Sequence, residues 1–283
     1  MISSKKHVDV TLRKYNLVAN KSLGQNFLVE SDIASYIVDS ANITKETLVI
    51  EIGPGMGALT EFALAKAKKV KAFEIDNNMV TILNDTFNCS NIEINNIDFL
   101  KVDIEKLIID SKNEGYEDIV VLSNLPYYIT SKLLNKTLAN NYPIRCIVAM
   151  MQKEVGHKII KPEKKDYNEL SVILGYQYDV SIVKYVGKNS YLPRPEIDSI
   201  VLKFEKVQPR YDVNFVDLKV VIEALFVARR KTIYNNLKNL FNDVSVIEEC
   251  LNTCNILANT RVEQIGLEEI ISISKFYMGQ KTK

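Results

Sequence analysis

A polar and aromatic turn follows the apolar run Val120–Ser123, and its residues could position an amine for reaction. The side-chain oxygen of Asn124 and a backbone carbonyl held by the Leu125-Pro126 bond can each accept one N–H of the same amino group. Proline fixes its own φ and keeps Leu125 extended, so that carbonyl is preset. Tyr127 adds a flat face on which a nucleobase can stack. Such a turn can orient a weakly nucleophilic base amine, unless it only ends a strand and Tyr127 packs in the core.

A glycine-rich turn lies upstream and could hold a nucleotide-like ligand. In the segment LVIEIGPGMGALTEFALAKA, Gly53, Gly55 and Gly57 let the backbone turn tightly and let a ligand approach it closely. The amphipathic stretch that follows would present free N–H groups and the positive end of a helix dipole. Glu74 ends the next apolar run, where a carboxylate can accept both hydroxyls of a ribose. The alternative is a glycine turn that serves the structure alone.

Two ligands suit this glycine turn, a dinucleotide and S-adenosylmethionine. The spacing Gly53-x-Gly55-x-x-Ala58 meets the dinucleotide fingerprint. Glu51 and Pro54 favour the methyl donor instead. A carboxylate disfavours a pyrophosphate nearby, whereas it attracts the ammonium and sulfonium groups of S-adenosylmethionine. We therefore predict a S-adenosylmethionine site.

Two more residues could complete a nucleobase site. Asp98 follows the third apolar run and could accept a hydrogen bond from an adenine amine, or it could cap the next short helix. Tyr191 precedes Pro193 and Pro195, which would stiffen its loop and hold the ring in place. Stacking between two rings is a common way to hold an unpaired base. Tyr191 is therefore a candidate second stacking ring, unless the loop is only a rigid surface connection.

The elements that must position these residues alternate between strands and helices. Apolar runs predict strands at Leu48–Ile52, Val70–Glu74, Ile92–Asn96, Ile119–Ser123, Cys146–Met151, Leu170–Tyr176 and Ser199–Phe204. Amphipathic stretches predict helices at Ala58–Ala67, Asn77–Phe87, Ser131–Asn140 and Val155–Ile160. This alternation predicts an α/β fold with a doubly wound, largely parallel sheet. No long helix separates the last two strands, which indicates an antiparallel pair at the edge.

The pattern changes after residue 210. From Phe215 onward apolar residues recur with helical spacing, and short helical pieces continue to the end of the chain. We predict two domains on this basis. A catalytic, cofactor-binding domain occupies residues 1–210, and a small α-helical domain occupies residues 211–283.

Composition and charge set broad limits on the class of protein. The chain has 283 residues, of which 47% are apolar and 25% are charged, as in an ordinary globular protein. No apolar run approaches the roughly 18 residues of a membrane span, and the N-terminus lacks the apolar region of a secretory signal. We expect a cytoplasmic protein with no membrane contact. We expect the four cysteines to be packed free thiols rather than a zinc site or a disulfide.

The net charge of +1 conceals two basic clusters. The first 26 residues contain Lys5, Lys6, Arg13, Lys14 and Lys21. The second cluster is Arg229-Arg230-Lys231. Clusters of this kind can form a phosphate-binding face, although they can also be ordinary solvated surface.

The chain resembles the bacterial small-subunit rRNA adenine dimethyltransferases (KsgA or RsmA). The matching stretches are KSLGQNFL (21–28), EIGPGMGALT (51–60), EIDNNM (74–79), NLPYYIT (124–130), QKEV (152–155), YLPRPEIDS (191–199) and LFVARRKTIYNNL (225–237). The resemblance implies a class I S-adenosylmethionine-dependent methyltransferase, with a seven-stranded Rossmann-like sheet and a C-terminal helical domain. It also implies a substrate. Two adjacent adenines in the loop of the 3′-terminal helix of 16S rRNA would each be dimethylated on N6, within an immature small ribosomal subunit.

The same resemblance assigns the cofactor-binding residues, apart from Gly55, which comes from the glycine turn. The catalytic and RNA-binding residues come from the turn, the proline loop and the basic cluster described above. We expect the enzyme to act as a monomer late in ribosome biogenesis. The expected cofactor-binding residues are Asn26, Leu28, Gly53, Gly55, Glu74, Asp98 and Asn124. The expected catalytic residues are Asn124, Leu125, Pro126, Tyr127 and Tyr191, and the expected RNA-binding residues are Arg229, Arg230 and Lys231. The GQNFL segment would be a lid over the cofactor. Two residues depart from the family pattern, with Ile97 in place of a glycine and Tyr191 in place of a phenylalanine.

Three other functions compete with this interpretation. The antibiotic-resistance methyltransferases that act on 23S rRNA would share the glycine turn, Glu74, Asp98 and an Asn-x-Pro-Tyr turn, but the contexts YLPRPEIDS and ARRKTIYNNL favour the 16S enzymes. An NAD-dependent oxidoreductase would need a catalytic histidine or Lys-Tyr pair, for which His157 is the sole candidate. An RNA-binding assembly factor that has lost catalysis would be distinguished by a test of methyl transfer to immature small subunits.

Overall fold

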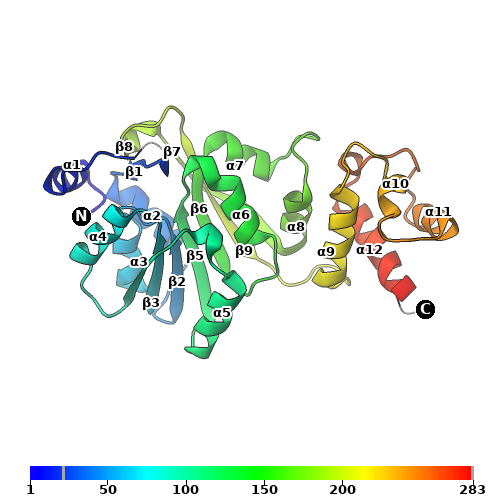
Figure 1. Ribbon diagram of the computed structural model, residues 1–283, viewed down its shortest axis with the longest axis horizontal. Coiled ribbons are helices and arrows are strands. Elements are labelled where there is room, and N and C mark those ends of the chain that lie inside the picture. Colours follow the sequence, from blue (N-terminus) through cyan, green and yellow to red (C-terminus); the bar gives the residue numbers. More distant parts are fainter. Residues whose placement is uncertain (21–22, 282–283) are drawn as a thin grey trace. The chain divides into compact units, whose positions relative to one another are not determined.

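The first compact unit of the chain is built on a seven-stranded sheet (Figure 1). The structure is a computed structural model that describes residues 1–20 and 23–281, so Lys21 of the N-terminal basic cluster lies outside the described residues. The strand order is β4-β3-β2-β5-β6-β9-β7. The strands are β2 (Thr47–Ile52), β3 (Lys69–Glu74), β4 (Ile92–Asn96), β5 (Asp118–Asn124), β6 (Cys146–Gln152), β7 (Tyr178–Val186) and β9 (Ser199–Lys206).

The directions of these strands confirm the predicted doubly wound fold. Strands β4, β3, β2, β5 and β6 pair in parallel, and β9 runs antiparallel to β6. Every residue of β2 is buried, as are nearly all residues of β5 and β6. Strands buried on both faces need a helical layer on each side. The helices of this unit are α1 (Lys5–Lys14), α2 (Ser31–Ser40), α3 (Thr60–Lys66), α4 (Asn77–Thr86), α5 (Ile104–Asn113), α6 (Thr130–Leu138) and α7 (Lys153–Ile160).

A second, two-stranded sheet joins two segments that are far apart in the sequence. Strand β1 (Phe27–Leu28) lies in the GQNFL segment, and β8 (Tyr191–Leu192) lies in the proline-rich loop. The two strands run antiparallel, with Leu28 paired to Tyr191. Both residues are buried, so this pairing carries the Tyr191 ring into the core.

The predicted strand Leu170–Tyr176 is wrong, because these residues belong to helix α8 (Glu169–Gln177). Asn168 caps α8 by accepting a hydrogen bond from the backbone N–H of Ser171. Most residues of α8 are buried, and the apolar run Leu170–Tyr176 has the composition of a buried strand, so sequence alone does not distinguish the two. The missing strand of the sheet is β7, which begins where α8 ends.

The second compact unit is helical. It contains residues 161–178 together with residues 207–283, and therefore includes α8 from the middle of the chain. Its other helices are α9 (Phe215–Phe226), α10 (Ile233–Leu237), α11 (Val244–Thr253) and α12 (Leu267–Lys281). Among the described residues, no helix has the length and apolar character that a bilayer crossing would require.

Candidate active site

A cavity of about 200 Å³ opens at the edge of the sheet where β2, β3 and β5 end. The carboxyl ends of neighbouring parallel strands meet at one edge, and ligands of α/β sheets bind there. The cavity wall includes these residues that the sequence singled out: Asn26, Leu28, Glu51, Gly53, Gly55, Glu74, Asp98, Asn124, Leu125, Pro126 and Tyr127. The fold thus brings together residues separated by as much as a third of the chain.

The glycine turn between β2 and α3 forms one wall of this cavity. Gly53 has a φ of +67°, and a Cβ atom added to it would meet nothing within 4 Å. Its backbone is therefore open to a ligand at close range. Gly57 has a φ of +92°, and a Cβ atom there would come within 2.5 Å of the Phe87 ring. Glycine is thus required at position 57 both by backbone conformation and by packing.

Glu74 ends β3 with its carboxylate held by the backbone. Its Oε1 accepts hydrogen bonds of 2.9 Å from the N–H groups of Ile75 and Asp76, and its Oε2 accepts one of 3.1 Å from Gly55. Burial raises the pKa of Glu74, and these three hydrogen bonds oppose that rise. The carboxylate is therefore fixed in position at the cavity wall.

Glu51 is a second buried acid in the same wall. Only 1% of the residue is exposed, and its carboxylate accepts a 2.7 Å hydrogen bond from the hydroxyl of Thr60. Burial raises the pKa of Glu51 to about 7, the Thr60 hydrogen bond opposes this, and the charge of Glu74 adds to it. No described lysine or arginine forms an ion pair with Glu51 or Glu74. Buried acids without a cation of their own favour a positively charged ligand.

Asp98 has the capping role that the sequence left open, and it also faces the cavity. Its carboxylate accepts a 2.9 Å hydrogen bond from the N–H of Leu100 and caps the short 3₁₀ helix Phe99–Lys101. Ile97 lines the cavity beside it. Capping holds Asp98 in place but does not by itself assign it a ligand.

The Asn124 turn is anchored so that two oxygen atoms stay available. The Asn124 Nδ2 lies 3.4 Å from the carbonyl of Asn26 and donates to it, which leaves the Asn124 Oδ1 as the free acceptor. The Pro126 carbonyl is occupied, because Ile129 N–H and the Thr130 hydroxyl donate to it. The Leu125 N–H donates to Met150 at 2.9 Å, whereas its carbonyl accepts no hydrogen bond from the described residues. The preset carbonyl is therefore that of Leu125.

The two tyrosines expected to form a stacking pair have different surroundings. Tyr127 lines the cavity, and its hydroxyl lies 2.8 Å from the hydroxyl of Ser199 at the start of β9. Tyr191 is only 4% exposed and is not part of the cavity wall. Its hydroxyl donates to the sulfur of Met150 at 2.9 Å. The structure does not bring Tyr191 to the cavity, and its role as a stacking ring stays a prediction.

Several cavity residues were missed from the sequence. Ile2 and Val8 reach the cavity from the N-terminal segment, where the Ile2 N–H donates to Glu61 at 2.8 Å. Isolated apolar residues near a chain end carry no signal of a ligand site. Tyr128 also lines the cavity, and its position directly after the NLPY motif could have indicated it.

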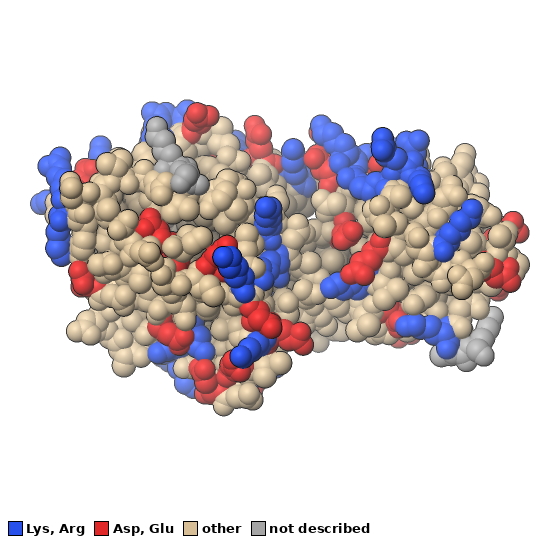
Figure 2. Space-filling model, in the orientation of Figure 1, with Lys and Arg blue, Asp and Glu red and all other residues tan. Residues whose placement is uncertain are grey.

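The basic residues Arg229, Arg230 and Lys231 lie in the helical unit, after α9. The Arg229 guanidinium donates to the carbonyls of Lys164 and Lys165, at 3.4 and 3.2 Å, and so holds the loop before α8. Arg230 and Lys231 are exposed. Figure 2 shows lysine and arginine side chains gathered over this loop and the end of α9. The helical unit therefore presents a local group of basic side chains, with acidic residues such as Glu163 among them.

Comparison with known proteins identifies relatives over nearly the whole chain. The chain is 42% identical over 274 residues to a ribosomal RNA small subunit methyltransferase A of Bacillus pumilus, a match that covers 93% of this chain and 92% of the relative. It is 40% identical over 281 residues to the protein of the same name from Bacillus cytotoxicus, covering 96% of each.

Two solved structures have the same fold. A dimethyladenosine transferase from Plasmodium falciparum matches with a TM-score of 0.65 at 22% identity, over 86% of this chain and 94% of that one. The 23S rRNA methyltransferase ErmE matches with a TM-score of 0.65 at 21% identity, over 89% of this chain and 100% of that one. Identity this low supports the fold alone.

The family model described as ribosomal RNA adenine dimethylase matches residues 16–278 of the chain. The cavity described above lies almost wholly within that span. The chain therefore belongs to the ribosomal RNA adenine dimethylase family, whose members are S-adenosylmethionine-dependent methyltransferases.

Proposed function

We propose that the protein dimethylates N6 of two adjacent adenines in the loop of the 3′-terminal helix of 16S rRNA. Membership of the adenine dimethylase family supports the reaction, and similarity to small-subunit methyltransferases supports the substrate. The observation that carries the chemistry is the pair of free acceptors at the cavity, the Asn124 Oδ1 and the Leu125 carbonyl. An amino group has two N–H donors, and this pair can engage both.

The cavity residues fit S-adenosylmethionine. When bound, this cofactor supplies an electrophilic methyl group on a positively charged sulfur. Glu51 and Glu74 provide buried negative charge that has no cation from the described residues. Gly53 leaves its backbone open to close approach. We assign cofactor contacts to these residues and to Asn26, Leu28, Gly55, Asp98 and Asn124.

The chain's own contribution to the reaction is orientation of the amine. In the first transfer the Asn124 Oδ1 and the Leu125 carbonyl each accept one N–H, which directs the nitrogen lone pair into the cavity. The methylated amine has given up one proton and keeps one N–H, so in the second transfer only one of the two acceptors is engaged. Pro126 keeps the Leu125 carbonyl preset, and the ring of Tyr127 supports the base from one side. Correct placement of two reacting groups can by itself supply a large part of a rate enhancement.

We further propose that Arg229, Arg230 and Lys231 contact the RNA backbone of an immature small subunit, with the enzyme acting as a cytoplasmic monomer. Replacement of exposed Arg230 and Lys231 by alanine should weaken binding to small subunits. The slope of the logarithm of the binding constant against the logarithm of the salt concentration should become shallower by about one for each phosphate contact that the variant loses. The cofactor affinity should not change. Filter binding between 50 and 200 mM salt measures this slope.

One assay tests the proposed function directly. Small subunits that lack these methyl groups are incubated with the protein and tritiated S-adenosylmethionine, and modified bases are mapped by primer extension, which stops at dimethyladenine. We expect two adjacent stops near the 3′ end of 16S rRNA. Methylation of 23S rRNA instead, or tight binding to small subunits with no transfer at all, would refute the proposal.

A further inference from the structure

Tyr128 is an exposed aromatic ring at the cavity that the reaction described above does not use. It is 55% exposed, although it follows directly on the half-buried Tyr127. Its hydroxyl forms no hydrogen bond with the described residues. A large aromatic side chain left open beside a ligand cavity is a candidate binding surface.

Local backbone geometry explains why the two neighbouring rings differ. Tyr127 and Tyr128 begin the 3₁₀ helix Tyr127–Ile129, in which successive side chains point about 120° apart because there are three residues per turn. The Tyr127 hydroxyl is bound to Ser199, so the Tyr127 ring is directed toward the sheet. The Tyr128 ring is consequently directed elsewhere, toward the cavity mouth and solvent.

The Tyr128 ring is supported by the segment that precedes β1. A Cβ atom added to Gly24 would lie 3.2 Å from the Cδ1 and 3.6 Å from the Cε1 of Tyr128. Gly24 also has a φ of +61°, so glycine lets this segment approach the ring closely. The backbone of Gly24 therefore supports one side of the ring, while over half of Tyr128 stays free for a ligand.

We propose that Tyr128 stacks on the nucleobase next to the adenine being methylated, and so helps to position the RNA; this rests on the proposed function. A base that enters an active site leaves its stack, and its neighbour then loses a stacking partner. An exposed tyrosine one residue from the catalytic turn can replace that partner, since every base offers a flat face. The exposure of Tyr128 to solvent favours RNA, which approaches from solvent, over the cofactor as the partner of this ring.

The test compares Tyr128→Ala, Tyr128→Leu and Tyr128→Phe with the unchanged enzyme. Tyr185→Ala is the matched control, because Tyr185 is a 50% exposed tyrosine on β7 outside the cavity wall. Loss of the ring should lower kcat/KM for unmethylated small subunits by about ten- to a hundredfold, mainly through KM. Tyr128→Phe and the control should stay within about twofold, as should the affinity of every variant for S-adenosylhomocysteine.

A second measurement separates stacking from a general structural effect. Small subunits are reconstituted with uridine in place of the adenine next to the target, since a pyrimidine stacks less strongly. Because the replaced adenine is itself a methyl acceptor, the rate is measured at the remaining target adenine alone. The unchanged enzyme should methylate that adenine several-fold more slowly than in the unmodified sequence, whereas Tyr128→Ala should show no such difference between substrates. Equal losses of cofactor affinity and kcat/KM, or a kcat/KM unchanged in Tyr128→Ala, would overturn the proposal. Absence of transfer by the unchanged enzyme would instead refute the proposed function.

Discussion

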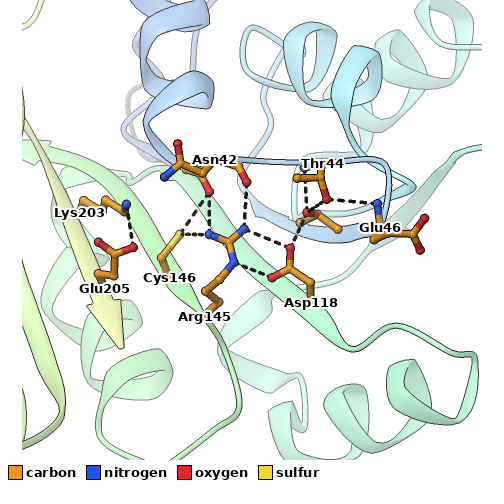
Figure 3. Close-up of polar contacts among 10 residues, drawn as sticks. Asn42, Thr44, Glu46, Asp118, Arg145, Cys146, Lys203 and Glu205 are labelled. Atoms are coloured by element: carbon orange, nitrogen blue, oxygen red, sulfur yellow. Dashed lines mark hydrogen bonds and ion pairs between the residues drawn. The ribbon is translucent and has the colours of Figure 1, made fainter. Parts of the chain in front are cut away.

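The two ends of the central strands differ in whether buried charged groups have an ion-pair partner within the chain. At the amino end, Arg145 lies between Asp118 at the start of β5 and the loop after α2 (Figure 3). Its Nε and Nη2 lie 2.6 and 3.1 Å from the two carboxylate oxygens of Asp118. Its Nη1 and Nη2 also donate to the carbonyls of Ala41 and Asn42. Thr47 at the start of β2 donates to Asp118 at 2.5 Å. Both charged groups, Asp118 and Arg145, therefore have partners within the chain.

At the carboxyl end, β2 and β3 carry two buried acids, Glu51 and Glu74, that form no ion pair with a described lysine or arginine. Glu51 of β2 is buried, and its pKa is raised to about 7, mainly by burial. Burial would also raise the pKa of Asp118, but hydrogen bonds from Arg145 and Thr47 outweigh it and lower that pKa. One end of the sheet therefore stabilises the fold. The other end keeps destabilising groups that a ligand can satisfy, as is usual for functional sites.

The largest expected effect is on catalysis at the carboxyl end. Asn124→Ala removes one of the two acceptors for the amine, and we expect methyl transfer to fall by about 10²- to 10³-fold. Stability should change by less than about 1 kcal/mol, because the one hydrogen bond that disappears is long and only partly buried. Methyl transfer to unmethylated small subunits and thermal unfolding measure the two effects. Asn135→Ala, on the exposed side of α6, is the control, and retained turnover in Asn124→Ala would contradict the assignment.

The second prediction concerns stability and pH at Glu51. The pKa of Glu51 is about 7 in the folded protein and 4.5 in the unfolded chain, so the protonated side chain favours folding. Its contribution to the free energy of unfolding is complete below pH 4.5 and is lost as the pH rises through 7. Glu51→Gln removes this loss. We expect the ligand-free variant to gain on the order of 3 kcal/mol of unfolding free energy at pH 8 and nothing at pH 4.

Urea unfolding at the two pH values measures this gain. Glu46→Gln is the control, because the Glu46 side chain is 80% exposed and the variant should show no comparable difference in stability. A Glu51→Gln variant no more stable than the unchanged protein at pH 8 would show that the two ends of the sheet do not differ as described.

The third prediction concerns the amino end. Asp118→Ala leaves Arg145 partly buried without its carboxylate, and we expect a loss of about 2 kcal/mol in unfolding free energy, less than for a fully buried pair. The value of kcat for the folded enzyme should be unchanged, because the pair lies at the opposite end of β5 from Asn124. Asp39→Ala, which removes an exposed ion pair with Lys66, should cost under about 0.5 kcal/mol. Equal losses in the two variants would contradict the prediction.

The smallest effect should come from the hydrogen bond that orients Tyr127. Ser199→Ala removes the partner of the Tyr127 hydroxyl, and we expect kcat/KM to fall by about three- to tenfold, as expected for one hydrogen bond. Tyr127→Phe should show a similar loss. In the double variant the two losses should not add, because both substitutions remove the same hydrogen bond. Full additivity would mean that the hydroxyl pair does not position the ring.

Local sequence patterns were sufficient for most of the sheet and for the acidic wall of the site. Apolar runs bounded by turn residues placed β2 through β6 and β9 to within a few residues. The pattern failed at α8, since most of this short helix is buried and its less buried positions, such as Ser171 and Gly175, do not form a charged face that would reveal its period. It also missed β7, whose exposed residues alternate irregularly.

By itself, the sequence determined the features that depend on neighbouring residues, such as the glycine turn, the Pro126-preset carbonyl and the acids at the strand ends. Only the tertiary structure decided which side chains reach the cavity. Pairing of Leu28 with Tyr191 buries one predicted ring, and the Ser199 contact of Tyr127 leaves Tyr128 as the exposed ring. These contacts join residues far apart in the chain, and local spacing contains no information about such pairs.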